Sequence, residues 1–394
     1  MIRLGWGYVM VDVMPTDAAA LPTDRPSTPV TGAQTVLSAR ALNRALLERQ
    51  LLLRRQTLRV GDALEHLVGL QAQNPNGPYF GLWTRLADFH PDDLAGMIDR
   101  RLVVRIALMR WTLHVVTARD CRALRPLVQS VMERRMRALF GRHLAGVDLD
   151  RLVTAGRALV EEQPRSLGDV GRLLAADWPE HEPSVLGNAL AALAPLVQVP
   201  PRGLWGRNGR AVQTTAESWL GRPLEPAGAP DALILRYLTA FGPAGIDDIR
   251  TWSGLCGVGE AIERLRPQLR SFRDEHGREL LDVPGGPLPD PATPAPPRFL
   301  PEGDNAVLSH ADRTRIVSDA HRRLVTAHKT FLIDGFVGGT WKIIRGPRIL
   351  TLAISPIAAI AREDRLALAE EGAQLLAFAA GEDDVRISVR FREE

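Results

Sequence analysis

Lysine and cysteine are scarce in this chain of 394 residues. Lys329 and Lys342 are the only lysines, so arginine carries nearly all of the positive charge, and the formal net charge is +3. Cys121 and Cys256 are the only cysteines and lie far apart in the sequence. Two separated thiols favour a reducing compartment and exclude a disulfide scaffold or a cysteine-based metal site. We therefore expect a cytoplasmic protein.

Long apolar runs and cofactor motifs are missing as well. No segment approaches the length of a transmembrane span, and the apolar run at residues 5–11 is interrupted by Asp12. We therefore expect neither a membrane anchor nor a signal peptide. The sequence has no Walker motif, no His-Glu-x-x-His motif, no Cys-x-x-Cys pair and no dinucleotide fingerprint. These absences predict a protein that uses no metal and no nucleotide cofactor.

The order of helical and strand-like segments predicts several units. Residues 1–35 contain four prolines and no apolar period, which is typical of a disordered extension. Groups of helices followed by a β-hairpin then recur at 36–143, 144–226 and 227–295, and the last group ends in a proline-rich strap. Residues 296–394 are richer in strand patterns. We predict an α+β fold that is predominantly helical, with tandem winged-helix units (helix-turn-helix plus β-hairpin) and a C-terminal α/β domain.

Arginine is concentrated around the first predicted hairpin. Between Arg100 and His143 the sequence has eleven arginines and only two acidic residues, Asp120 and Glu133. The segment is either a solvated helical face or a surface for phosphates. Its position beside a predicted DNA-reading hairpin favours phosphates, which arginine binds through planar, paired hydrogen bonds.

Six side chains on two predicted hairpins are candidates for DNA binding. The first hairpin joins residues 102–108 to 111–116, and alternation places every second side chain of its second strand on one face. The second hairpin joins 195–199 to 211–215 through a tip rich in arginine and glycine. The predicted DNA contacts are Arg110, Thr112, His114, Arg202, Arg207 and Arg210. For His114, the alternative is a hydrogen-bonded histidine of the core or of the sheet surface.

A buried stripe leads into two glutamines. Val60, Leu64, Leu67 and Val68 recur at helical spacing, and the next position on the stripe is Gln71. An unpaired buried amide costs roughly 1–3 kcal/mol, so Gln71 must find a partner or face a cavity. Pro75 favours the end of the helix just before it, and a fraying end lets Gln71 and Gln73 converge. Alternatively, Gln71 is a satisfied core amide and Gln73 a solvated cap.

An ordered set of short segments resembles the AlkZ-type winged-helix DNA glycosylases. The set begins with Gly-Leu-Gln-Ala-Gln-Asn-Pro at 69–75, and the similarity extends from about residue 36 to the C-terminus. The other segments are Tyr79–Trp83, Met109–His114, Gly242–Gly245, Leu308–Arg313 and Asp334–Trp341. The resemblance implies that Gln71-Ala72-Gln73 is the catalytic Gln-apolar-Gln motif of that family. Some relatives carry Asp in place of the second Gln, and Gln73 is similar to the branch that acts on bulky lesions and interstrand cross-links.

The resemblance also implies a function. We expect a monofunctional DNA glycosylase, without cofactor, that hydrolyses the N-glycosidic bond of bulky N7-alkylguanine and unhooks interstrand cross-links left by a natural product. Its partner would be double-stranded DNA with alkylated or cross-linked guanine, and the protein would be a monomer at the nucleoid.

Two alternatives stay open. One is a non-catalytic winged-helix regulator of DNA. The other is a hydrolase built on Ser309, His310 and Asp312, next to Arg313, although no nucleophile elbow surrounds the serine.

Overall fold

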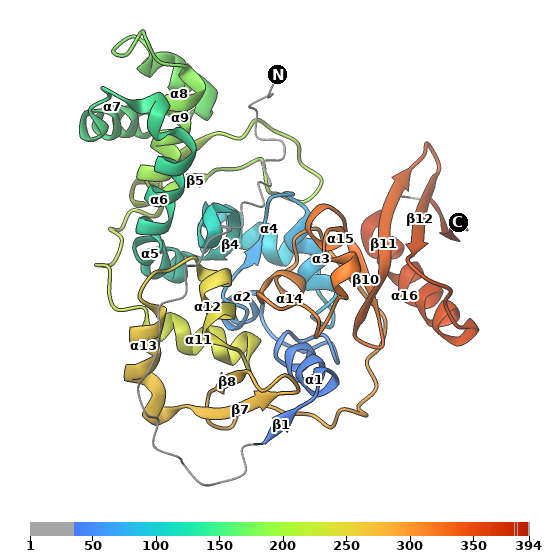
Figure 1. Cartoon of the computed structure of the whole chain (residues 1–394). Helices are drawn as coiled ribbons and strands as arrows, with labels where there is room; N and C mark the ends of the chain where they lie inside the picture. Colours follow the sequence, from blue (N-terminus) through green and yellow to red (C-terminus); the bar gives the residue numbers. More distant parts are fainter. Residues whose placement is uncertain (1–34, 382, 384, 393–394) are drawn as a thin grey trace.

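The computed structural model describes residues 35–381, 383 and 385–392, and the predicted disordered extension lies outside this range except for Thr35. Helices and three separate sheets confirm the α+β class (Figure 1). In the described part of the chain, no helix is long and apolar enough to cross a membrane. Nor do these residues include a group of three or more His, Cys, Asp or Glu side chains placed to hold a metal ion.

One five-stranded antiparallel sheet occupies the centre of the molecule. Its order is β2-β4-β3-β5-β6, with β2 at Leu70–Gln71, β3 at Val103–Ala107, β4 at Leu113–Thr117, β5 at Leu196–Gln198 and β6 at Gln213–Thr215. Both predicted hairpins therefore exist. They are not separate wings, because β3 pairs with β5 through Arg105 opposite Gln198 and Ile106 opposite Val197. The first two predicted units thus share one sheet, whose strands β3 to β6 are buried throughout.

The second predicted unit supplies a helical lobe, at the upper left in Figure 1. It consists of α7 (Leu149–Glu162), α8 (Leu167–Leu174) and α9 (Pro183–Leu193), followed by α10 (Ala216–Leu220). Asp148 caps α7 by accepting from the Asp150 and Arg151 N–H groups. Gly171 lets α8 approach α9 closely, because a Cβ there would lie 1.9 Å from the Pro183 carbonyl oxygen. Two basic helices, α5 (Ala118–Leu127) and α6 (Gln129–Phe140), connect this lobe to the central sheet.

The third predicted unit and the first helix of the chain form another layer. It contains α11 (Asp231–Phe241), α12 (Ile246–Ser253), α13 (Val258–Leu265), and the hairpin of β7 (Arg270–Asp274) and β8 (Glu279–Asp282). The hairpin is confirmed, and β1 (Val36–Leu37) extends it by pairing parallel to β7. The helix α1 (Ala39–Arg49) begins after its cap Ser38, whose side chain accepts from the Ala41 N–H.

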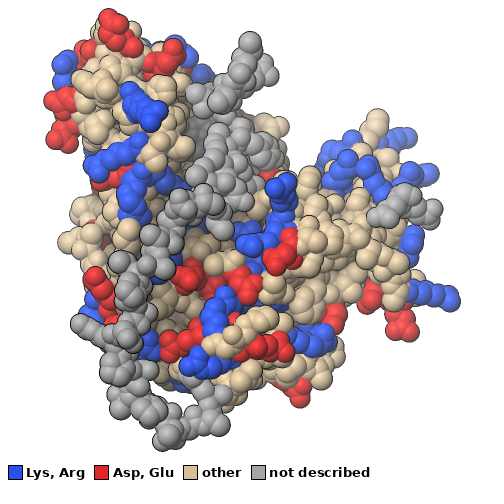
Figure 2. All heavy atoms as spheres, viewed as in Figure 1, with Lys and Arg blue, Asp and Glu red and all other residues tan. Residues whose placement is uncertain are grey.

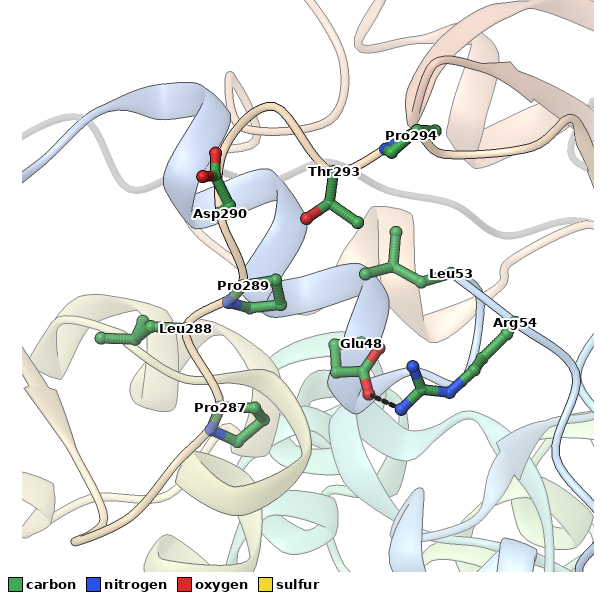
Figure 3. Close-up of a pocket in the computed structure, with 9 residues that line it drawn as sticks. All are labelled: Glu48, Leu53, Arg54, Pro287, Leu288, Pro289, Asp290, Thr293 and Pro294. Atoms are coloured by element: carbon green, nitrogen blue, oxygen red, sulfur yellow. Dashed lines mark hydrogen bonds and ion pairs between the residues drawn. The ribbon is translucent and has the colours of Figure 1, made fainter.

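The proline-rich strap at 284–297 runs along α1. Arginines of α1 hold its backbone: Arg40 donates to the Pro291 carbonyl, Arg44 to that of Thr293 and Arg49 to that of Pro287. A pocket of about 470 Å³ lies between strap and helix, lined by Glu48, Leu53, Arg54, Pro287–Asp290, Thr293 and Pro294 (Figure 3). The strap is therefore a fastened segment and not a free linker.

The C-terminal domain is a five-stranded sheet of order β13-β12-β11-β10-β9 covered by one long helix. Its elements are β9 (Arg298–Leu300), β10 (Thr330–Ile333), β11 (Phe336–Arg345), β12 (Ile349–Pro356), α16 (Arg362–Ala380) and β13 (Arg386–Phe391). It shares an apolar core with the remaining helices of the first unit, α2 (Val60–His66), α3 (Gly77–Trp83) and α4 (Pro91–Asp99). Phe80 of α3 contacts both Trp341 and Phe378, with ring centroids 5.6 and 5.9 Å away. The short helices α14 (Asn305–Leu308) and α15 (Leu324–Ala327) connect β9 to β10.

Candidate active site

Gln71 and Gln73 come together on an extended segment and not at a frayed helix end. The predicted helix through Gln71 is wrong, because α2 ends at His66 and the backbone reverses at Val68 and Gly69, with φ of 55° and 85°. Gly69 cannot be replaced easily, since a Cβ there would lie 2.5 Å from Val116 Cγ1. The chain then enters β2, where side chains two residues apart share one side. Gln73 lies two residues past the end of β2, and both glutamines meet β4: Gln71 lies opposite His114, and the Gln73 side chain bonds to Leu113.

Gln71 is half-buried and lies opposite His114 in the pairing of β2 with β4. Its Oε1 accepts a hydrogen bond of 3.0 Å from Arg110 Nη2, and because a guanidinium can only donate, this contact fixes which end of the amide is oxygen. A Cβ on Gly303 would lie 2.6 Å from Nε2 of Gln71, so the glycine leaves room for the amide. Within the described residues Nε2 has no acceptor, which leaves it as a donor for a substrate.

Gln73 is exposed, and its Oε1 accepts from the Leu113 backbone N–H at 2.8 Å. The side-chain oxygen of Gln73 thus acts as the hydrogen-bond acceptor for Leu113, a role that a backbone carbonyl of the neighbouring strand usually has. The carbonyl of Ala72 instead accepts from Arg105 Nε at 2.9 Å, and Arg105 Nη2 also reaches the Gln73 carbonyl at 3.1 Å. Arg105 therefore fixes the backbone between the two glutamines. The sequence shows only that arginines are frequent in this segment, so it does not reveal this role.

His114 lies fully buried beside Gln71. Its Nδ1 bonds to the Thr112 carbonyl at 2.9 Å, and in the described part of the chain its buried Nε2 has no hydrogen-bond partner. Burial, followed by the charge of Arg110, lowers the pKa of His114 to about 3, so the ring is neutral with a lone pair on Nε2. This position matches the alternative of a hydrogen-bonded buried histidine. Thr112 is also engaged locally, since its hydroxyl donates to the Met109 carbonyl.

Arg110 is not the free tip of a wing. It sits in a tight turn, Met109–Thr112, in which Arg110 and Trp111 have φ of 56° and 55°. Two consecutive left-handed residues without glycine cost roughly 1–3 kcal/mol each, so packing must stabilise this turn. The side chain is half-buried and donates to the Trp252 carbonyl at 2.8 Å as well as to Gln71. Burial, then the charges of Arg313 and Arg135, lower its pKa to about 10.

The predicted phosphate loop at 201–210 is anchored next to the glutamine pair. Trp205 packs on Tyr79, with ring centroids 5.0 Å apart, and the Tyr79 hydroxyl donates to the Gly203 carbonyl at 2.8 Å. Arg202 is half-buried and bonds to the Gly209 carbonyl, whereas Arg207 is exposed. The third predicted contact, Arg210, pairs with Asp169 at 2.7 Å, so part of its charge is already balanced.

The Ser309–His310 pair lies in the core. Both residues are at most 2% exposed, Ser309 Oγ lies 2.9 Å from His310 Nδ1, and His310 Nε2 donates to the Phe241 carbonyl at 3.1 Å. Asp312 bonds instead to Arg278. Arg313 donates to the His310 carbonyl. A buried serine cannot reach a substrate, so the geometry argues against the hydrolase alternative and gives the pair a structural role.

Comparisons with known proteins identify the family and a similar fold. The family model described as "DNA glycosylase AlkZ-like" matches residues 64–378, which include Gln71, Gln73 and Arg110. The fold is similar to that of the Streptomyces sahachiroi DNA glycosylase AlkZ, with a TM-score of 0.71 and 20% identity over 91% of this chain and 100% of that chain. No curated protein matches the chain. Because the family model spans most of its length, the chain belongs to the AlkZ-like family of DNA glycosylases.

Proposed function

We propose that the chain is a monofunctional glycosylase that removes bulky N7-alkylguanine from double-stranded DNA. The observation that carries the proposal is the pair of oriented amides at one sheet edge. Arg110 fixes the oxygen of Gln71 and the Leu113 N–H fixes the oxygen of Gln73. Both amides keep an NH₂ group without an acceptor among the described residues.

The chemistry of this lesion suits amides. An N7-alkylated guanine is cationic, so the bond between C1′ and N9 breaks with its electron pair moving to the base, which leaves neutral. Water then adds to the oxocarbenium carbon and loses its proton to solvent, because an amide does not accept a proton at neutral pH. A glutamine oxygen has a second lone pair that can hold this water, and its NH₂ can donate to the sugar or the lesion. Positioning and electrostatics are sufficient, and no cofactor takes part.

An open site supports bulky and cross-linked substrates. Enzymes that extrude a base need a pocket for it, but a cross-linked guanine is tied to both strands and cannot swing out fully. Gln73 is exposed at the sheet edge. Two pockets of about 470 Å³ lie elsewhere, one at the strap (Figure 3) and one against α7 and α8, and neither is lined by Gln71 or Gln73. We extend the proposal to the unhooking of cross-links and to resistance against a DNA-alkylating natural product, by a monomer acting at the nucleoid.

Single-turnover excision from a duplex with one bulky N7-alkylguanine, followed by alkaline cleavage, tests the proposal. Gln71→Ala and Gln73→Ala should each slow excision by about 10²-fold, since loss of one oriented hydrogen-bond partner acts on the transition state. DNA affinity should stay near that of the wild type. Gln163→Ala, which removes an exposed amide after α7, is the matched control.

Melting temperatures of the same variants distinguish catalysis from folding. A variant that melts early but keeps its rate per folded molecule would contradict the catalytic assignment. Retention of the duplex by the wild type without any strand break would instead support the non-catalytic regulator. Gln73→Asp then tests whether a carboxylate shifts preference toward smaller alkyl lesions.

A further inference from the structure

Arg110 has an unusual set of partners for a half-buried arginine. Its guanidinium donates to two neutral oxygens, the Trp252 carbonyl at 2.8 Å and Gln71 Oε1 at 3.0 Å. Within the described residues it forms no ion pair, although Arg49 and Arg85 each face a buried carboxylate at 2.7 Å. A guanidinium has more N–H groups than these two bonds use. Its positive charge therefore remains available beside Gln71.

A second arginine is attached to the same turn. Arg135 lies on the accessible side of α6 and donates from Nη1 to the Arg110 carbonyl at 2.9 Å. It likewise forms no ion pair in the described part of the chain. Like charges gathered in one place repel, and an anion placed between them relieves the repulsion.

The turn that carries Arg110 has a strained backbone conformation. Arg110 and Trp111 both occupy the left-handed region without glycine. Backbone strain of this kind concentrates where a side chain must be aimed for function. In this conformation the Arg110 side chain reaches Gln71, and its backbone carbonyl accepts the hydrogen bond from Arg135.

We infer that Arg110 and Arg135 bind one phosphate of the DNA backbone beside the lesion, and that Arg110 transmits this contact to Gln71. The inference deepens the proposed function and depends on it for the identity of the anion. Planar guanidinium groups bind phosphate oxygens in pairs, which suits a fixed backbone phosphate better than a mobile ion. Because the same guanidinium holds Gln71 Oε1, an occupied phosphate site restricts the orientation of the catalytic amide. Arg110 is then a positioning residue, and Arg135 a DNA contact.

Neutral-backbone scanning locates the phosphate. In a lesion duplex, each phosphate near the N7-alkylguanine is replaced in turn by an uncharged methylphosphonate, and the excision rate and dissociation constant are measured. For the wild type, one position should weaken binding by about tenfold, as expected for the loss of one charged contact. In Arg135→Ala, the same replacement should weaken binding less than in the wild type, because one of the two arginine contacts to that phosphate is already missing.

A matched arginine on the same helix provides the control. Arg137 is exposed on α6 and pairs with Glu133 at 3.8 Å. Arg137→Ala should keep the methylphosphonate effect of the wild type. Arg135→Ala should also flatten the plot of log affinity against log salt by about one unit of slope. An unchanged slope, or a methylphosphonate loss that adds fully to that of Arg135→Ala, overturns the phosphate site.

Arg110→Lys tests the link to Gln71. Lysine keeps the charge but lacks the planar fork, so it cannot hold Gln71, the Trp252 carbonyl and a phosphate together. We expect near-normal binding but about a tenfold lower excision rate at saturating enzyme. A wild-type rate in a folded Arg110→Lys variant overturns the link. These failures are distinct from failure of the proposed function, which would show as a wild-type rate in Gln71→Ala.

Discussion

Two groups of arginines in this protein meet different partners. One group pairs with buried carboxylates where separate segments of the chain join, as Arg85 does with Asp304 and Arg49 with Asp282, both at 2.7 Å. The other group surrounds the glutamines, and there Arg105 and Arg110 contact only carbonyl and amide oxygens. The residue type is the same, so the partners decide the role. Balanced arginines hold the fold together, whereas unbalanced ones leave positive charge at the site.

The difference has a consequence for DNA binding. Arginine stays protonated under ordinary conditions, so an arginine without a carboxylate keeps its charge until an anion arrives. Exposed cations add to this charge elsewhere on the surface. Figure 2 shows Lys and Arg gathered over the projecting end of β11 and β12, where Lys342, Arg345 and Arg348 are exposed. The protein therefore combines arginines that are balanced by buried carboxylates with arginines at the site, and exposed cations elsewhere, that are available to anions.

Breaking a balanced pair should give the largest effect. Arg85→Met leaves the Asp304 carboxylate buried without its partner, and both side chains are 0% exposed. Removing one member of a buried pair costs roughly 3–5 kcal/mol of unfolding free energy. Glu48→Gln, which removes the exposed Arg54–Glu48 pair, should cost less than about 1 kcal/mol. Chemical denaturation of both variants measures the difference, and equal costs would remove the distinction between the two groups.

In the wild type, salt should affect DNA binding by the unbalanced arginines much more than it affects the buried arginine–carboxylate pairs. If about six phosphates are contacted, DNA affinity should fall by about 10³-fold between roughly 50 and 200 mM salt. The unfolding free energy should change much less over the same range, because buried pairs are poorly screened. Fluorescence anisotropy with damaged and undamaged duplex measures the affinity. Salt-independent binding, or tight selection of one sequence, would contradict a backbone-directed surface.

Lower pH should destabilise the fold through His114, the buried histidine whose pKa the charge of Arg110 helps to lower. Burial holds the pKa of His114 at about 3, so the ring is neutral in the fold but protonated in the unfolded chain below about pH 6.5. Its contribution to stability is therefore present above that pH and is lost as pH falls, by roughly 1.4 kcal/mol per unit for one histidine. Burial shifts the pKa of His310 in the same direction.

Histidine variants resolve this dependence. The unfolding free energy is measured at about pH 6.5 and 4.5 for the wild type, His114→Asn and His143→Asn. We expect His114→Asn to reduce the slope of unfolding free energy against pH by about one proton. The His143→Asn variant, which changes an exposed side chain, should leave that slope unchanged. The same slope in all three proteins would show that His114 is protonated in the fold.

The smallest effect concerns the loop at 201–210. Arg207 is exposed and forms no ion pair among the described residues, whereas Arg210 already pairs with Asp169. Arg207→Ala should therefore reduce the salt slope of DNA binding by about one unit, and Arg210→Ala by less. A larger loss for Arg210→Ala would mean that its ion pair opens when DNA binds.

The sequence by itself determined the elements whose signal is local. Strand-like segments at 102–108 and 111–116, and at 195–199 and 211–215, predicted the two hairpins of the central sheet, and both are present. The glutamines could also be identified from the sequence, because the segments around them resemble a known family. These features depend on neighbours within a few residues, so the order of side chains is enough.

Only the tertiary structure decided how these elements combine. Gly69 turns the chain against Val116, and the expected end of a helix is instead a short strand that pairs Gln71 with His114 and leads to Gln73 beside Leu113. The two hairpins merge because β3 pairs with β5 far along the chain. Arginine partners are equally remote: Arg85 meets Asp304, 219 residues later. A long-range contact leaves no periodic trace in the sequence, so the charge balance that separates structural from site arginines emerges only after folding.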